Sequence, residues 1–177
     1  MSVDQCESSV RGRLPQTRGQ ERSSNRHVGG ALFFDHTGSK IFIRHQHSLS
    51  GRETVDAKRD VERECLSEGV IVKACRSDNG VFAKQDFERA LLSNQQVLCR
   101  AGVGAKFQNG VAERAIGTVQ NMARAMLLHL RLHWPDEFDP NSWPFAMDHA
   151  VWMCNNTPPL MTLYLADKGT TIQSFAL

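Results

Sequence analysis

The order of the apolar runs constrains the fold of this chain more than any other feature of its sequence. Two β-rich runs, GALFFDH at 30–36 and KIFIRHQ at 40–46, are separated by Thr-Gly-Ser, which predicts a β-hairpin. A short alternating run at 2–8 predicts one strand before it. Further along, helix-like and strand-like runs alternate. This order predicts an α/β fold with a mixed five-stranded sheet, antiparallel in the hairpin and parallel where helices cross over.

Four helices are expected to flank the sheet. Gly69 is a typical residue for ending the helix over 51–69, Pro135 for ending the helix over 110–134, and Pro158-Pro159 for ending the helix over 142–156. In the fourth helix we expect Phe145, Val151 and Trp152 to face inward. We also expect the three tryptophans to pack the last two helices together. The expected helices are 51–69, 84–94, 110–134 and 142–156.

The remaining segments give the other two strands and one loop. The apolar runs at 70–77 and 96–102 are each expected to form a buried strand. Residues 7–28 are polar, contain five arginines and show no periodicity, so they are expected to form a long exposed loop.

Composition limits the classes of protein to consider. With 177 residues and 41% hydrophobic residues, the chain suits one globular domain. Its formal net charge is only +2, which by itself does not indicate a nucleic-acid partner. The charge is unevenly distributed, because residues 106–133 hold four Lys and Arg residues against Glu113 alone. A locally basic helix is compatible with a phosphate-facing surface and equally with a solvated helix face.

The cysteines and the apolar runs indicate the compartment. The five cysteines are odd in number and contain no CxxC pair, so neither a disulfide framework nor a zinc ribbon is indicated. The N-terminus is polar, which is unlike a secretory signal. No apolar run approaches the roughly 18 residues that span a bilayer. We therefore expect a soluble protein in a reducing compartment, with no membrane partner.

Three carboxylates stand at positions where a ligand could approach. Asp78 ends the most apolar strand and precedes Asn79-Gly80, although an Asx turn explains it equally well. Asp4 lies in a short strand, where Asp is a poor β-former, and a disordered chain end is the alternative. Glu113 lies in the first turns of the long helix, where the positive helix dipole also favours an acid.

If these three carboxylates converge, their mutual repulsion requires a cation. Hard oxygen ligands suit Mg²⁺ or Mn²⁺, which keep bound waters and contact substrate phosphates. A pair of such ions would activate a hydroxyl group and stabilise the leaving oxygen of a phosphodiester. The hypothesis from the residues is therefore phosphoryl transfer with two divalent ions and no small-molecule cofactor.

The histidine pairs have spacings that can also bind metal. His45 and His47 alternate on one strand, and His129 and His133 are four residues apart on a helix. Because neither pair has a third ligand in view, we interpret them as surface or packing residues.

The motifs around the three acids resemble a known family. The segments SVDQCES, RSDNGVF, GVGAKFQNGVAERAIGTV and WPFAMDHAVWMCNNTP look like the integrase of a copia-type LTR retrotransposon polyprotein. The 35-residue spacing from Asp78 to Glu113 resembles the D,D(35)E triad of retroviral and retrotransposon integrase cores. The resemblance covers residues 1–159, and residues 160–177 remain unassigned.

The resemblance implies an RNase H-like fold and metal-dependent processing and joining of DNA ends. Asp4, Asp78 and Glu113 would be the catalytic residues and the ligands of two Mg²⁺ or Mn²⁺ ions. The partners would be element ends and target DNA, together with further copies of the chain, in the nucleus and in the cytoplasm during element replication. Further residues could contact DNA through amide or cationic groups, with helix capping and solvated charge as the alternatives: Asn79, Lys106, Gln108, Asn109, Arg114 and Arg124.

The sequence also departs from the family pattern. The chain starts three residues before Asp4, and the upstream His/Cys zinc module and the C-terminal DNA-binding tail are not recognised. Lys106 and Phe107 stand where relatives commonly carry histidine. Three readings therefore remain open: an active integrase core, an inactive remnant that binds DNA or oligomerises, and a nuclease that only hydrolyses.

Overall fold

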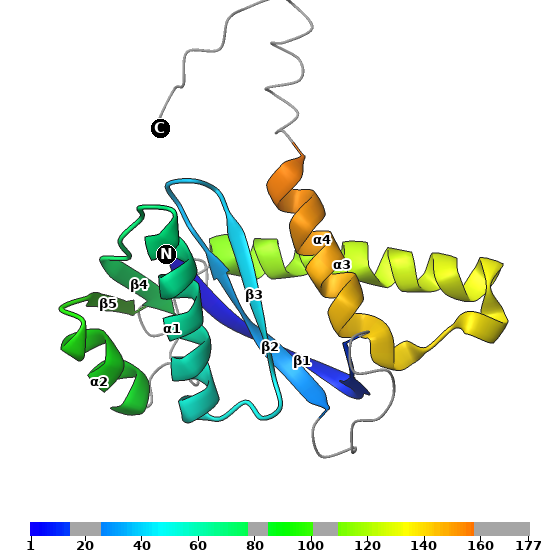
Figure 1. Cartoon of the computed structure of the whole chain (residues 1–177), viewed down its shortest axis with the longest axis horizontal. Helices are drawn as coiled ribbons and strands as arrows, with labels where there is room; N and C mark the ends of the chain where they lie inside the picture. Colours follow the sequence, from blue (N-terminus) through cyan, green and yellow to red (C-terminus); the bar gives the residue numbers. More distant parts are fainter. Residues whose placement is uncertain (15–25, 78–84, 101–109, 158–177) are drawn as a thin grey trace, which may run out of the picture.

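The computed structural model describes residues 1–14, 26–77, 85–100 and 110–157 (Figure 1). Their strands form one sheet in the order β3-β2-β1-β4-β5. The predicted mixed five-stranded sheet is confirmed, because β1 is antiparallel to β2, β2 is antiparallel to β3, and β1, β4 and β5 are parallel. The strands are β1 Ser2–Gly12, β2 His27–Phe34, β3 Ile41–Gln46, β4 Ala74–Ser77 and β5 Val97–Arg100.

Helices cover both faces of the sheet. The first core joins one face to α1 and α2, through residues such as Phe33, Val61 and Leu91. The second core joins the other face to α3 and α4, through residues such as Leu32 and Val119. Because neighbouring residues of a strand point to opposite faces, Leu32 and Phe33 belong to different cores. The helices are α1 Gly51–Ser67, α2 Gln85–Ser93, α3 Gly110–His133 and α4 Trp143–Asn156, with 3₁₀ turns η5 Pro135–Glu137 and η6 Pro140–Ser142 before α4.

Local signals fix several boundaries where they were predicted. The Asp35 carboxylate accepts hydrogen bonds from the backbone N–H groups of Thr37 and Gly38, which closes the β2–β3 hairpin turn. The Ser50 side chain caps the first turn of α1. Gly69 follows α1 with φ at +78°, the left-handed conformation that glycine adopts without strain.

The prediction of a loop over residues 7–28 is wrong at both ends. Strand β1 continues to Gly12 and β2 begins at His27, and these two residues pair across the ladder after an irregularity beyond Glu7. Pairing with a neighbouring strand satisfies backbone groups whatever the side chains are, so a polar segment can be a strand. The arginines at 18 and 22 lie outside the described residues.

Strand β4 is shorter than predicted, and the predicted end of β5 at residues 101–102 lies outside the described residues. Strand β4 begins at Ala74, so residues 70–73 precede it. Strand β5 lies at the edge of the sheet, and Val97 is 60% exposed, so the prediction of a buried strand there is wrong. An apolar run does not reveal whether a strand is central or at the edge.

The orientation predicted for α4 is also wrong, apart from Val151. Phe145 and Trp152 are 54% and 60% exposed, whereas Trp143 and Val151 are buried. The buried residues Trp143, Ala146, Met147, Ala150 and Val151 follow the spacing of one helix face. Trp134 is exposed as well, so only Trp143 packs as expected.

Candidate functional site

Asp4 lies on the sheet face that α3 covers. Its partner across the ladder is Leu32, which belongs to the core beneath α3 and α4, and residues paired across a ladder share a face. The next residue, Gln5, points to the other face and donates hydrogen bonds to Gln46 and Thr54. The Asp4 carboxylate is half-buried and accepts a hydrogen bond of 2.8 Å from the Gln5 backbone N–H.

Glu113 lies in the first turn of α3 and is exposed. Helix α3 buries Ala112, Ala115 and Ile116, so Glu113 projects from the flank of the buried stripe. Gln120 and Arg124 are seven and eleven residues further along and share that flank. The first turn of a helix is a favourable place for a carboxylate, and equally for an anion held through a cation.

Strand β1 and helix α3 run in the same direction (Figure 1). A hollow between them is lined by Cys6, Glu7, Ser8 and Ser9 of β1 and by the stretch of α3 that includes Gln120 and Arg124. Glu113 precedes Gln120 by two helical turns, which is about 10 Å along α3. Asp4 precedes the β1 residues that line the hollow by a similar distance along the strand. The two carboxylates therefore lie on facing elements, toward the same end of β1 and α3.

Strand β4 ends beside this part of β1. Ser2 pairs with Arg76 in the parallel ladder, so Ser77, the last residue of β4, is level with Val3. Asp78 is the next residue of the chain and lies outside the described residues.

Two of the six residues predicted to contact DNA lie within the described part of the chain. Arg114 is exposed on the side of α3 that faces away from the sheet, and Arg124 is exposed at the hollow beside Glu7 and Ser8. Asn79, Lys106, Gln108 and Asn109 lie outside the described residues. Within the described ranges, no group of three His, Cys, Asp or Glu side chains could hold a metal ion.

Sequence reasoning missed a histidine cluster between the sheet and α4. The rings of His27 and His47 stack with centroids 4.3 Å apart, and His27 lies 5.5 Å from His45. His45 Nε2 lies 2.7 Å from an Asp148 carboxylate oxygen. Burial, followed by repulsion from His47 and His45, lowers the pKa of His27 to about 4. The signal was weak because His27 fell in the predicted loop.

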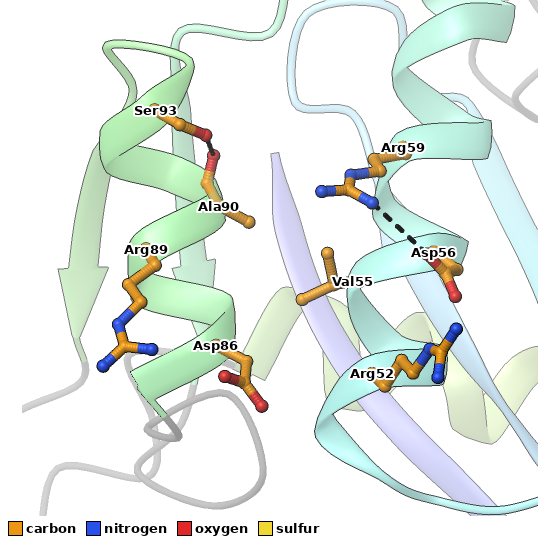
Figure 2. Close-up of a pocket in the computed structure, with 8 residues that line it drawn as sticks. All are labelled: Arg52, Val55, Asp56, Arg59, Asp86, Arg89, Ala90 and Ser93. Atoms are coloured by element: carbon orange, nitrogen blue, oxygen red, sulfur yellow. Dashed lines mark hydrogen bonds and ion pairs between the residues drawn. The ribbon is translucent and has the colours of Figure 1, made fainter.

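A second cleft separates α1 from α2 (Figure 2). It has a volume of about 560 Å³ and is lined by three arginines and two aspartates. Figure 2 shows the Arg59 side chain directed toward Asp56, with their charged groups 3.5 Å apart, and Arg89 directed away from α1. Because the lining charges have both signs and the guanidinium groups do not converge, we assign no ligand to this cleft.

The sequence and the fold can both be compared with those of known proteins. No protein-family model and no curated protein matches the sequence. The fold is similar to the BIV integrase catalytic core domain, with a TM-score of 0.58 and 11% identity over 95% of this chain and 94% of that chain. It is also similar to the HTLV-2 integrase catalytic core domain solved with magnesium in a dimeric form, with a TM-score of 0.56 and 16% identity over 89% and 86% of the two chains.

A third similar structure is the simian T-cell lymphotropic virus intasome in complex with PP2A regulatory subunit B56 gamma. The TM-score is 0.55 and the identity 13%, over 90% of this chain and 55% of that chain. At such low identities the likeness concerns the fold alone. The chain has the RNase H-like fold of retroviral integrase catalytic cores, as predicted.

Proposed function

We propose that this chain is the catalytic core of a copia-type retrotransposon integrase that processes and joins DNA ends with divalent metal ions. One observation carries the proposal: Asp4 and Glu113 lie on facing elements, toward the same end of β1 and α3, where β4 also ends. The similarity of the whole fold to integrase cores supports it.

The three acids would hold the metal ions. Asp78 is included because β4 pairs with β1 in parallel and the chain reaches Asp78 directly after β4. The half-buried Asp4 and the exposed Glu113 supply hard oxygen donors that suit Mg²⁺ or Mn²⁺. Two bound ions would supply a Lewis acid and an activated hydroxyl for cleavage of a phosphodiester. The HTLV-2 core was solved in complex with magnesium, which agrees with this choice.

The basic and amide residues would hold the DNA backbone. Arg114 and Arg124 are exposed on α3, one on its outer side and one at the hollow along β1. Lys106 and the side-chain amides of Asn79, Gln108 and Asn109 would contact the backbone of the DNA strand that is bound at the three acids. Such contacts position phosphates without reading the sequence.

Assembly and location complete the proposal. We propose that the chain acts as a homo-oligomer on element ends and target DNA in the nucleus, and is present in the cytoplasm during element replication. The solved neighbours include dimeric and trimeric HTLV-2 cores and an intasome, which supports oligomerisation. Among the described residues, no helix is long and apolar enough to cross a bilayer.

The test is nicking and strand transfer on a short DNA duplex with Mn²⁺. Glu113→Gln should abolish both activities while the protein keeps its fold. Glu137→Gln is the matched control, because Glu137 lies in η5 beyond the far end of α3. Equal activity of Glu113→Gln and the wild type would overturn the proposed site.

The alternative is an inactive integrase remnant that only binds DNA or oligomerises. It is favoured by the departures in sequence, such as Lys106 and Phe107 in place of the usual histidine. A folded wild-type protein that binds DNA but neither nicks nor joins it would establish this alternative. Nicking without strand transfer would indicate a nuclease instead.

A further inference from the structure

The sheet face that carries Asp4 is covered by helices over only part of its width. Among the described residues, the core beneath α3 and α4 contains residues of β1, β2 and β3 but none of β4 or β5. Residues of β4 and β5 join the other core, on the side of α1 and α2. Strand β4 is the direct neighbour of β1, so the uncovered part of this face begins beside the proposed catalytic site.

Arg76 is exposed on this uncovered face. It pairs with Ser2 in the parallel ladder, and Ser2 and Asp4 are two residues apart on β1, so all three side chains project from the same face. Val97 shares the face, because its ladder partner Ala74 is two residues from Arg76, and it is 60% exposed. A cation therefore stands on an open surface next to Asp4.

The charge of Arg76 is not neutralised within the described part of the chain. The ion pairs there involve other cations, such as Arg13, Arg44 and Lys58, and none includes Arg76. A guanidinium group is planar and presents several N–H donors, which makes it well suited to two parallel hydrogen bonds with a phosphate. Its position and its chemistry both suit an anion that arrives with the substrate.

We propose that Arg76 binds a backbone phosphate of the DNA strand that is held at the acids, on the side of Asp4 opposite to Arg124. This inference rests on the proposed function and adds a residue that positions the substrate. Arg124 lines the hollow beside the β1 residues that follow Asp4. Arg76 is level with Ser2, which precedes Asp4, so the two arginines flank the acids.

The register of the sheet indicates which phosphate Arg76 contacts. A strand rises about 3.3 Å per residue and neighbouring strands lie about 4.8 Å apart, so the Cα atoms of Arg76 and Asp4 are about 8 Å apart. One DNA strand advances about 3.4 Å along the helix axis per nucleotide. The phosphate at Arg76 should therefore lie about two nucleotides from the phosphate that is cleaved.

The first test measures binding of the full chain to a DNA duplex without divalent metal, by fluorescence anisotropy over a range of salt concentrations. Arg76→Gln should reduce the slope of log affinity against log salt by about 0.9, because one phosphate contact is lost. Arg76→Lys keeps the positive charge and should recover most of the slope. Lys73→Gln is the matched control, because Lys73 is exposed just before β4 and an odd number of residues from Arg76, which places it toward the other face.

The second test locates the contact relative to the cleaved bond. A duplex with one neutral methylphosphonate linkage is nicked with Mn²⁺, and the products are resolved by position. In the wild type, nicking about two nucleotides to one side of the neutral linkage should fall by about tenfold. In Arg76→Gln the neutral linkage should cause no further loss at that position, since the contact is already absent, while effects at other positions should remain.

The outcomes separate this inference from the proposed function. Equal salt slopes for Arg76→Gln and Lys73→Gln would overturn the phosphate contact, even if the wild type nicks DNA. The same positional pattern in Arg76→Gln and the wild type would overturn its place beside the acids. A wild type that binds DNA without nicking it would contradict the proposed catalytic activity, and the salt slopes would then decide the role of Arg76 alone. A folded wild type that does not bind DNA would overturn both.

Discussion

The side-chain amide of Asn155 bonds to both backbone groups of Ile41. The Ile41 N–H donates to Asn155 Oδ1 at 2.8 Å, and Asn155 Nδ2 donates to the Ile41 carbonyl at 2.7 Å. Ile41 begins β3, the edge strand next to β2, so these groups point away from the sheet. The amide thus occupies a position where another strand could pair, which protects part of this edge.

Asn155→Ala should destabilise the protein by about 1–2 kcal/mol, because it removes both hydrogen bonds to the Ile41 backbone. Denaturant unfolding measures the change. The control is Asn156→Ala, since the Asn156 side chain is also exposed but donates to the Trp152 carbonyl within its own helix. It should stay within about 0.5 kcal/mol of the wild type. Equal effects of the two substitutions would show that the Ile41 contact contributes nothing.

A buried ion pair inside α1 gives a second prediction. The Lys58 side chain is 1% exposed and its Nζ lies 2.6 Å from Glu62 Oε1, while Asn94 and Gln96 also donate to the Glu62 carboxylate. Glu62→Gln should cost about 3 kcal/mol or more, because it leaves the buried Lys58 cation without a counter-charge. Lys58→Met should cost less, since Glu62 is 16% exposed and keeps its amide donors.

The two variants can be compared by urea unfolding at neutral pH. A larger loss for Lys58→Met than for Glu62→Gln would contradict this account of the pair. The sequence contained a signal for the burial of Lys58: Thr54, Lys58, Val61 and Cys65 follow the helical period. Lys58 was not recognised as part of this buried stripe, because a charged residue is normally expected to be exposed.

Stability should fall in acid because of His27. Its pKa is about 4 in the folded protein, against an ordinary value of 6.5, so the unfolded chain binds more protons between these values. The contribution is complete above about pH 6.5 and is lost as the pH falls toward about 4, by up to about 3 kcal/mol. Unfolding measured along this range should show less pH dependence for His27→Asn.

His133→Asn is the matched control for this prediction. His133 is exposed at the end of α3, far in sequence from the cluster around His27, so the control should keep the pH dependence of the wild type. An unchanged pH dependence in His27→Asn would show that the cluster does not titrate as described.

Elements with strong local signals could be predicted from the sequence. The turn at Asp35, the end of α1 before Gly69 and the end of α3 before Pro135 each depend on a few neighbouring residues. The second half of β1 could not be predicted, because its polar residues are held as a strand by β2. The inward face of α4 was also missed, since Phe145 and Trp143 are equally apolar and the packing partner selects between them.

For the candidate site, the sequence predicted the element on which Asp4 and Glu113 each lie, but not how these elements are arranged in space. Asp4 on the first strand and Glu113 in the first turn of the long helix were expected from sequence, and both lie there. Their relation in space depends on how α3 packs along β1, which is a contact between segments far apart in the chain. His27 was missed for the same reason, because its histidine neighbours come from another strand.

Divalent metal should stabilise the folded chain if the three acids form one site. Millimolar Mn²⁺ at ten times its dissociation constant adds about 1.4 kcal/mol, which raises the melting temperature by roughly 3–6 °C. Asp78→Asn should shrink this shift and raise the metal-free stability, because it removes one of three like charges. A melting temperature that Mn²⁺ leaves unmoved, in a folded wild-type sample, would count against the site.

DNA binding should fall steeply with salt and depend on Arg124. The log of the affinity for duplex DNA drops with the log of the salt concentration by about 0.9 for each phosphate that a basic residue neutralises. Arg124→Gln should therefore reduce this slope by about 0.9 and weaken binding to different sequences alike.

Arg63→Gln is the control, because Arg63 is exposed on α1, the helix on the other face of the sheet, where it pairs with Asp60. Fluorescence anisotropy over a range of salt concentrations measures all three slopes. Sequence-specific binding that persists at high salt would contradict contacts directed mainly at phosphates, and equal slopes for the two variants would remove Arg124 from the DNA surface.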